Sequence, residues 1–99
     1  MDVLIVGGGG REHAIALALS GSPRVDKLYC APGNGGIAGI AECRAVKAAD
    51  MEGLLRLAGE IKPGLVFVAP DDPLAMGLVD MLEANGFRAF GPRKDAAIL

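Results

Sequence analysis

Aromatic and basic side chains are scarce in this chain of 99 residues. It has no tryptophan, one tyrosine and three phenylalanines, and twelve Asp and Glu outnumber ten Lys and Arg. The basic residues are scattered, with no cluster beyond Arg93-Lys94. Nucleic-acid binding draws on a positive surface and, for single strands, on aromatic stacking platforms. We therefore expect no nucleic-acid partner.

Potential metal ligands are also few. The chain has two cysteines, Cys30 and Cys43, and one histidine, His13. The cysteines are too few and too far apart for a zinc ribbon, and a lone histidine makes no metal site. We interpret the cysteines as two reduced thiols in or beside buried strands. No metal site is expected in this chain.

Long apolar runs are missing, although 52% of the residues are hydrophobic and the mean hydropathy is +0.39. The longest uninterrupted runs are residues 14–19 and 65–69. A helix that crosses a bilayer needs about 20 apolar residues. The start of the chain also lacks the pattern of a secretory signal. We expect no membrane association and a cytoplasmic location.

Short apolar runs alternate with helical patterns along the chain. We expect strands at residues 2–6, 27–31, 43–46, 65–69 and 88–90. Helices are expected at 11–20, at 51–61 after an Asp50 cap, and from Pro73 to a stop at Asn85-Gly86. Residues 2–6 read as a strand buried on both faces, and 65–69 as the clearest buried strand. This alternation predicts an α/β fold, an open parallel sheet with helices on both faces.

The end of the chain suggests a continuation. Residues 91–99 read as the start of a helix that ends in Ala-Ala-Ile-Leu, with no cap and no polar tail. An apolar helical face needs a neighbour to cover it. We therefore expect one domain over 1–99, with a core over about 1–90, as the front piece of a longer protein.

A run of four glycines, Gly7 to Gly10, joins the first strand to the first helix. Such a turn lets backbone N–H groups approach an anion such as a phosphate, which a helix N-terminus also favours. The dinucleotide fingerprint needs glycine at its sixth position, where this chain has Glu12 or His13. The second strand ends without the ribose-binding acid, and no Gly-Lys-Ser/Thr occurs. Dinucleotide and P-loop sites are disfavoured, and a plain tight turn remains the alternative.

Three polar residues follow the glycines, and each has two interpretations. Arg11 would clamp a phosphate or lie solvated in the first turn. Glu12 would contact a ligand or only complement the helix dipole. His13 would form a ligand hydrogen bond or serve the structure alone.

Four motifs together resemble one enzyme family. They are Gly7–Ala14, Ala31-Pro32-Gly33-Asn34, Pro70-Asp71-Asp72-Pro73-Leu74 and Phe90-Gly91-Pro92. In order and spacing they resemble the start of the phosphoribosylamine–glycine ligases, also called glycinamide ribonucleotide synthetases. The family usually has glutamate where this chain has Asp71, which is one methylene shorter. A contact carried over to Asp71 needs a closer loop or a bridging water.

The resemblance implies a Rossmann-like N-terminal domain that precedes the ATP-grasp domains of a ligase of de novo purine biosynthesis. In that family ATP activates the carboxylate of glycine as an acyl phosphate, and the amine of 5-phosphoribosylamine attacks it. The implied partners are these two substrates and the protein's own ATP-grasp domains, which would bind ATP and Mg²⁺. The chain alone is then expected to be inactive.

The candidate site follows from the position of the loops. In an open parallel sheet ligands bind outside the carboxyl ends of the strands, where the strand order reverses. In the order 3-2-1-4-5 the loops after the first, second and fourth strands meet there. No catalytic residue is assigned, and the candidate substrate-binding residues are Gly8, Gly9, Gly10, Arg11, Glu12, His13, Pro32, Gly33, Asn34, Pro70 and Asp71.

Three other functions stay open at this point. The first is the front domain of another ATP-grasp ligase or carboxylase, against which the Gly-Arg-Glu-His and Pro-Gly-Asn motifs argue. The second is a free-standing nucleotide- or dinucleotide-binding module. The third is a purely structural or dimerising domain.

Overall fold

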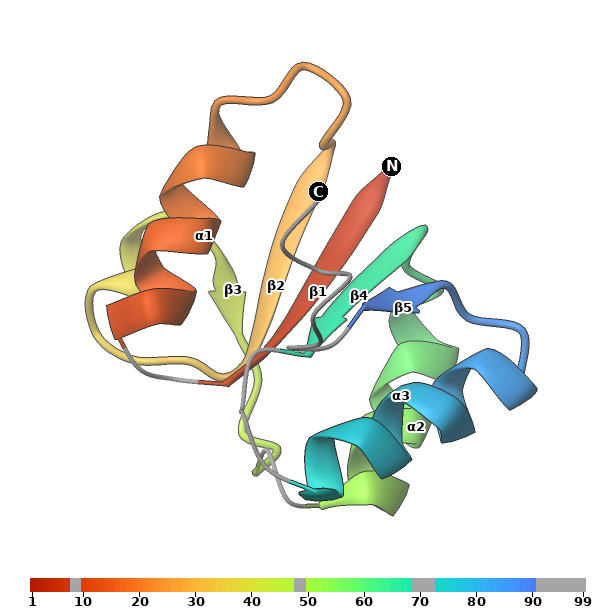
Figure 1. Cartoon of the computed structure of the whole chain (residues 1–99). Helices are drawn as coiled ribbons and strands as arrows, with labels where there is room; N and C mark the ends of the chain where they lie inside the picture. Colours follow the sequence, from red (N-terminus) through yellow and green to blue (C-terminus); the bar gives the residue numbers. More distant parts are fainter. Residues whose placement is uncertain (8–9, 48–49, 69–72, 91–99) are drawn as a thin grey trace.

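The sheet has five parallel strands in the order β3-β2-β1-β4-β5. In the computed structural model, which describes residues 1–7, 10–47, 50–68 and 73–90, the strands are β1 (Asp2–Gly7), β2 (Lys27–Pro32), β3 (Glu42–Cys43), β4 (Leu65–Val68) and β5 (Ala89–Phe90). Their carboxyl ends point to the same edge (Figure 1). This confirms the expected open parallel sheet, and β1 lies at its centre, where the strand order reverses.

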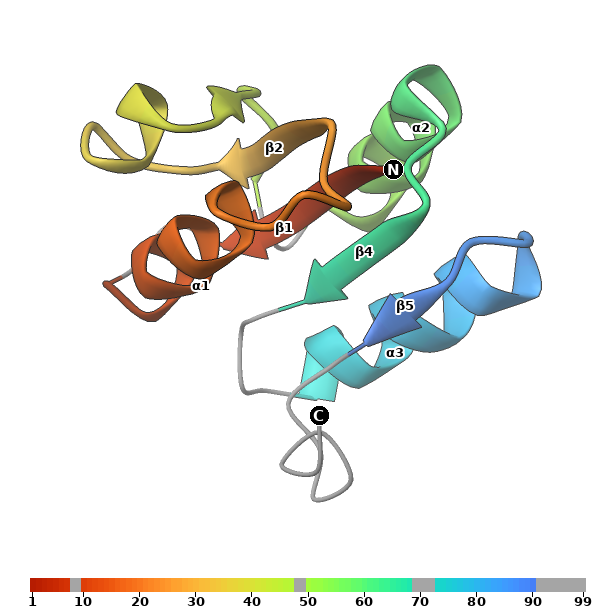
Figure 2. The ribbon, with the colours of Figure 1, turned by 90° about the horizontal axis from the view of Figure 1, so that it is seen from above.

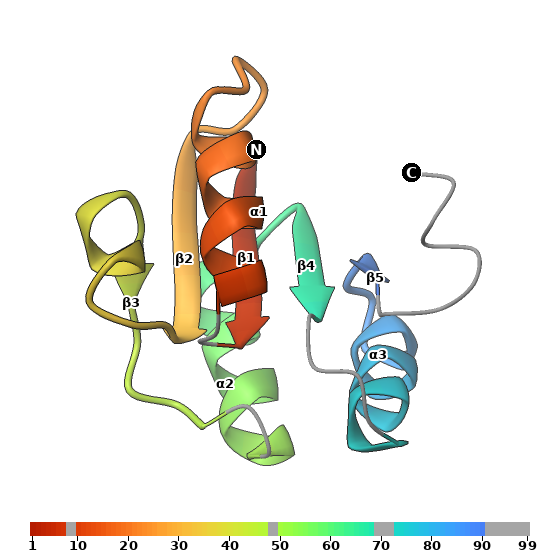
Figure 3. The same ribbon diagram turned by 60° about the vertical axis from the view of Figure 1, so that its left-hand side comes forward.

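Helices lie on both faces of this sheet, as expected. They are α1 (Gly10–Ser20), α2 (Met51–Ile61) and α3 (Pro73–Ala84), with a short 3₁₀ helix η1 (Ile37–Gly39). Figure 2 shows α1 and α2 on opposite sides of β1, and Figure 3 shows α1 in front of β1 and β2. None of the helices in the described part of the chain is long and apolar enough to cross a membrane.

The two layers of the core share β1, because successive side chains of a strand point to opposite faces. Among the described residues, six buried side chains form the layer on the α1 face: Val3, Ile5, Ala16, Leu28, Cys30 and Ile37. Thirteen form the layer under α2 and α3: Leu4, Val6, Tyr29, Ala31, Leu54, Leu57, Ala58, Val66, Val68, Leu78, Val79, Leu82 and Ala89.

The ends of α2 and α3 follow the capping signals in the sequence. The Asp50 side chain accepts a hydrogen bond from the Gly53 N–H at 2.9 Å, and Lys62 closes α2 with a left-handed φ of 52°. After α3, Gly86 has φ +88°, and the Phe87 N–H donates to the Leu82 carbonyl at 2.9 Å. That bond is typical of a glycine-terminated helix.

Two expectations about the strands were wrong. The third strand covers Glu42–Cys43 rather than 43–46, because after Cys43 the chain turns: the Val46 N–H donates to the carbonyl of Arg44 at 2.8 Å. The most buried strand is β1, with Val3 to Val6 at 0% exposure, whereas Leu65 and Phe67 of β4 are only half-buried. The reason is that α1 packs on β1 and β2, which leaves the same face of β4 less covered.

Candidate functional site

The loops after β1 and β2 are joined at the carboxyl edge of the sheet. The Gly7 carbonyl accepts hydrogen bonds from the Gly33 N–H at 3.1 Å and from the Cys30 thiol at 3.2 Å. The strand register also ends with Gly7 opposite Pro32. The start of the glycine turn and the Pro32-Gly33-Asn34 loop therefore lie side by side, as the sequence predicted.

Glu12 points into the protein rather than out of it. Its side chain is 7% exposed, and of the side chains that the structure describes it is the one charged group that is buried. A Cβ atom placed on Gly7 would lie 2.7 Å from Glu12 Cγ and 2.9 Å from Cδ. The side chain thus turns back from the first turn of α1 to cover the end of β1. Sequence reasoning had no signal for this direction, because a polar residue in the first turn of a helix is usually solvated.

His13 and Asn34 meet across the same edge. A Cβ atom on Gly36 would lie 2.7 Å from His13 Cε1, 3.0 Å from His13 Nδ1 and 3.4 Å from Asn34 Oδ1. Asn34 Oδ1 also accepts a hydrogen bond from the Ile37 N–H at 2.9 Å, at the start of η1. The imidazole of His13 therefore packs against the loop after β2, and the Asn34 side chain holds the start of η1 in that loop.

Gly33 needs to be glycine for two reasons. Its φ of +75° is left-handed, and a Cβ atom there would collide with the Cys43 sulfur. The pKa of the nearby Cys30 thiol is raised to about 11, mainly because the thiol is buried and to a smaller extent because Cys43 and Glu12 are close. Both cysteines are free, as expected, and at neutral pH the Cys30 thiol stays protonated. It is therefore a packing group and not a nucleophile.

The remaining candidate residues are placed only in part. The backbone of Gly10 and Arg11 forms the start of α1, and Pro32 lies exposed at the end of β2. Gly8, Gly9, Pro70 and Asp71 lie outside the described residues. Val68, the last described residue before that gap, pairs in register with Val6 of β1.

A metal site finds no support in the described part of the chain. No group of three or more His, Cys, Asp or Glu side chains is placed there to hold an ion. The donor set does not fit the Mg²⁺ that the family resemblance implies for the longer protein, because Mg²⁺ is held by carboxylates together with substrate phosphates. We assign no magnesium ligand to these residues.

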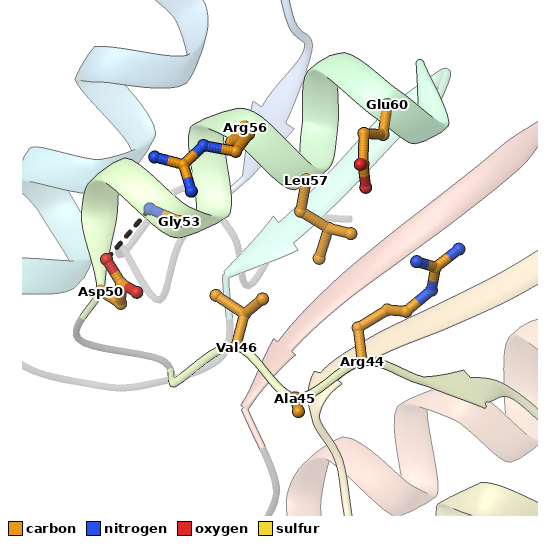
Figure 4. Close-up of a pocket in the computed structure, with 8 residues that line it drawn as sticks. All are labelled: Arg44, Ala45, Val46, Asp50, Gly53, Arg56, Leu57 and Glu60. Carbon is orange, nitrogen blue, oxygen red and sulfur yellow. Dashed lines mark hydrogen bonds between the residues drawn. The ribbon is translucent and has the colours of Figure 1, made fainter.

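A groove that the sequence did not predict lies between the β3–α2 connection and α2. It has a volume of about 330 Å³ and is lined by Arg44, Ala45, Val46, Asp50, Gly53, Arg56, Leu57 and Glu60. Figure 4 shows Val46 and Leu57 pointing toward one another in its middle, with Arg44 and Glu60 at one end.

Two of the four charged side chains that line this groove, Asp50 and Arg44, are engaged in contacts within the fold. Asp50 occupies the Gly53 N–H at the start of α2, so that helix end does not offer this donor to an anion. Arg44 Nε donates to Glu42 Oε2 at 2.6 Å and lies 5.6 Å from the centre of the Tyr29 ring. Lys27 and Arg44 together hold the pKa of Glu42 below its usual range through their hydrogen bonds. We therefore place the candidate site at the glycine turn and not in this groove.

The whole chain matches a known family and known enzymes. The family model is "Phosphoribosylglycinamide synthetase, N domain", over residues 1–99. Relatives named phosphoribosylamine–glycine ligase come from Caldanaerobacter subterraneus subsp. tengcongensis (50% identical), Caulobacter vibrioides (50%) and Brucella melitensis (48%). Each match covers 100% of this chain and 23–24% of the relative.

The chain thus spans about a quarter of the length of these relatives, at their N-terminal part. The motif order and the α/β sheet agree with that match. The chain belongs to the family of phosphoribosylglycinamide synthetase N domains.

Proposed function

We propose that this chain is the N-terminal, substrate-side domain of an ATP-dependent ligase that joins glycine to 5-phosphoribosylamine in de novo purine biosynthesis, in the cytoplasm. The observation that carries the proposal is the match over the full chain, at 46–50% identity, to enzymes named for this reaction. The site geometry supports it, because the motifs after β1 and β2 lie together at the sheet edge.

The substrate site that we propose lies outside the carboxyl ends of β1, β2 and β4. The N-terminus of α1, with Gly8, Gly9, Gly10 and Arg11, is suited to an anion such as a phosphate. Asn34 and Asp71 are suited to ribose hydroxyls or to an amine. Pro32, Gly33 and Pro70 shape the two loops that carry them, and His13 supports the loop after β2.

In this reaction we expect the domain to bind the amine substrate rather than to carry out the chemical step. Bound ATP would supply the phosphoryl group that activates the glycine carboxylate as glycyl phosphate. The amine of phosphoribosylamine then forms the C–N bond, and phosphate leaves. The residues of this chain hold and orient the amine substrate, which lowers the entropic cost of that attack. ATP and Mg²⁺ would be bound by ATP-grasp domains in the rest of the protein.

The proposal is tested with Arg11→Ala and a matched control, Arg56→Ala, in the full-length ligase that carries this chain. Arg56 is an exposed arginine of α2 outside the proposed site. We expect Arg11→Ala to raise KM for phosphoribosylamine about tenfold or more, as loss of a charge-assisted contact does, while Arg56→Ala stays near wild type.

Two outcomes would refute the proposal. One is a wild-type protein that forms no glycinamide ribonucleotide from ATP, glycine and phosphoribosylamine. The other is turnover by the isolated chain, because the domain would then need no partner domains.

A further inference from the structure

We propose that Glu12 is a positioning residue: its buried side chain fixes Gly7 at the end of β1 and does not contact substrate. This inference rests on the proposed function for its kinetic readout only. Its structural basis is the contact between Glu12 and Gly7, which can be tested independently of activity.

The contact between the two residues is tight and mutual. Glu12 Cγ, Cδ and Oε1 would lie 2.7, 2.9 and 3.3 Å from a Cβ atom on Gly7. Any side chain at position 7 would therefore collide with Glu12. Gly7 also has φ +135°, a conformation that other residues rarely adopt. Glu12 fills the space that the absent Gly7 side chain leaves, so the two residues define the packing of α1 on β1 at this point.

The same glycine connects Glu12 to the second loop of the site. The Gly7 carbonyl accepts bonds from the Gly33 N–H and from the buried Cys30 thiol. A change in the Gly7 backbone would therefore move the loop after β2 as well as the glycine turn. Glu12 thus packs against Gly7, the residue whose carbonyl binds the start of the loop after β2.

The direction of the side chain argues against substrate contact. Glu12 is 7% exposed and packs against Gly7, so little of its side chain is open to a ligand that binds outside the carboxyl ends of the strands. A carboxylate beside the phosphate group of the substrate would repel it. In the dinucleotide fingerprint the equivalent position is a glycine that allows close packing of helix and strand. Here a long acidic side chain occupies that position and packs against Gly7.

The kinetic experiment compares Glu12→Gln with Glu12→Ala in the full-length ligase. Glutamine keeps the length of the side chain and one of its two acceptor oxygens, so we expect KM for phosphoribosylamine within about threefold of wild type. Alanine removes the packing of Glu12 against Gly7. We therefore expect KM for phosphoribosylamine to rise about tenfold to a hundredfold, with kcat changed less than about threefold. Glu52→Ala, which removes an exposed acid from the first turn of α2, is the matched control and should change neither.

Two kinetic results would overturn the proposal. If glutamine loses as much affinity as alanine, the negative charge itself contacts substrate. If alanine lowers the thermal midpoint but leaves KM unchanged, the role is structural alone. A wild-type protein without turnover would refute the proposed function instead, and the next experiment would still test the contact.

That experiment measures the coupling between the two residues through the thermal midpoint of the full-length protein. Gly7→Ala should lower the midpoint less in a Glu12→Ala background than in wild type, because the collision with Glu12 is then gone. If Gly7→Ala alone yields no folded protein, recovery of folded protein in the double variant is the expected result. Additive midpoint shifts would contradict the contact.

Discussion

The two faces of the sheet differ in what they bury and in what they present. The face under α2 and α3 holds the larger apolar layer, with leucines from both helices against β1 and β4. The α1 face holds a smaller layer of six buried side chains, and one of them, Cys30, donates to the Gly7 carbonyl at the carboxyl edge. We infer that the first face supplies most of the stability and that the second positions the substrate loops. Substitutions in each layer and at the carboxyl edge test this division through their effects on stability and on KM.

The largest effect is expected in the α2–α3 layer. Leu54 is fully buried, so Leu54→Ala should lower the free energy of unfolding of the chain by about 3 kcal/mol through lost burial and a residual cavity. Leu17→Ala, on the outer side of α1 at 54% exposure, should cost less than about 0.5 kcal/mol. Urea unfolding followed by circular dichroism measures both. Similar losses for the two leucines would break the comparison.

At the carboxyl edge we expect stability to depend on the backbone conformation of glycine rather than on the burial of apolar side chains. Gly33→Ala should cost about 2 kcal/mol, since alanine would be strained at this φ and would collide with the Cys43 sulfur. Gly59→Ala is the matched control, because Gly59 lies in α2 with no atom near its Cβ position. There alanine should stabilise the chain by about 0.5–1 kcal/mol. A stabilising Gly33→Ala would show that the loop is not packed as described.

The sequence predicted the architecture well because its signals are local. Short apolar runs, the Asp50 cap and the Asn85-Gly86 stop each follow from a few neighbouring residues. The glycine turn and the Pro-Gly-Asn loop were also placed at one edge, because carboxyl ends of parallel strands meet there. The strand at Glu42–Cys43 was misplaced because a two-residue edge strand has too few positions to show an alternating pattern.

The packing inside the site could not be predicted, because it depends on residues that are distant in sequence. Nothing near Glu12 in the chain shows that its side chain turns back onto Gly7. The contact of His13 with the loop at Gly36 and the collision that keeps Gly33 a glycine likewise arise only when α1, β2 and β3 come together. Composition and periodicity carry no information about such contacts.

The buried thiol on the α1 face makes stability depend on pH in the alkaline range. The pKa of Cys30 is raised from 9.0 to about 11 in the folded chain, so below pH 9 both states hold the proton. Above pH 9 the unfolded chain loses it first, and stability should fall by about 2 kcal/mol up to pH 11. The measurement is the free energy of unfolding between pH 9 and pH 11, whose slope against pH is compared between wild type and Cys30→Ala. Equal slopes would mean that Cys30 does not titrate differently on folding.

The smallest effect is expected at the start of α2. Asp50→Ala removes the side chain that accepts from the Gly53 N–H, and should lower the free energy of unfolding by about 1 kcal/mol. Asp50→Asn, which keeps an acceptor oxygen, should restore most of the loss. In the full-length ligase neither variant should change KM for phosphoribosylamine, because the proposed site lies elsewhere. A raised KM in Asp50→Ala would assign the groove at α2 to the substrate.

The position of the proposed substrate site is tested most directly by finding which backbone amides a bound ligand protects from hydrogen exchange. Amide hydrogen exchange of the full-length ligase should be measured with and without a saturating amount of its proposed product, glycinamide ribonucleotide. We predict slower exchange in peptides that cover residues 7–13 and 32–36, and no change in residues 50–61 of α2. Protection confined to α2 and its groove, or no protection in the loops after β1 and β2, would contradict the proposed site.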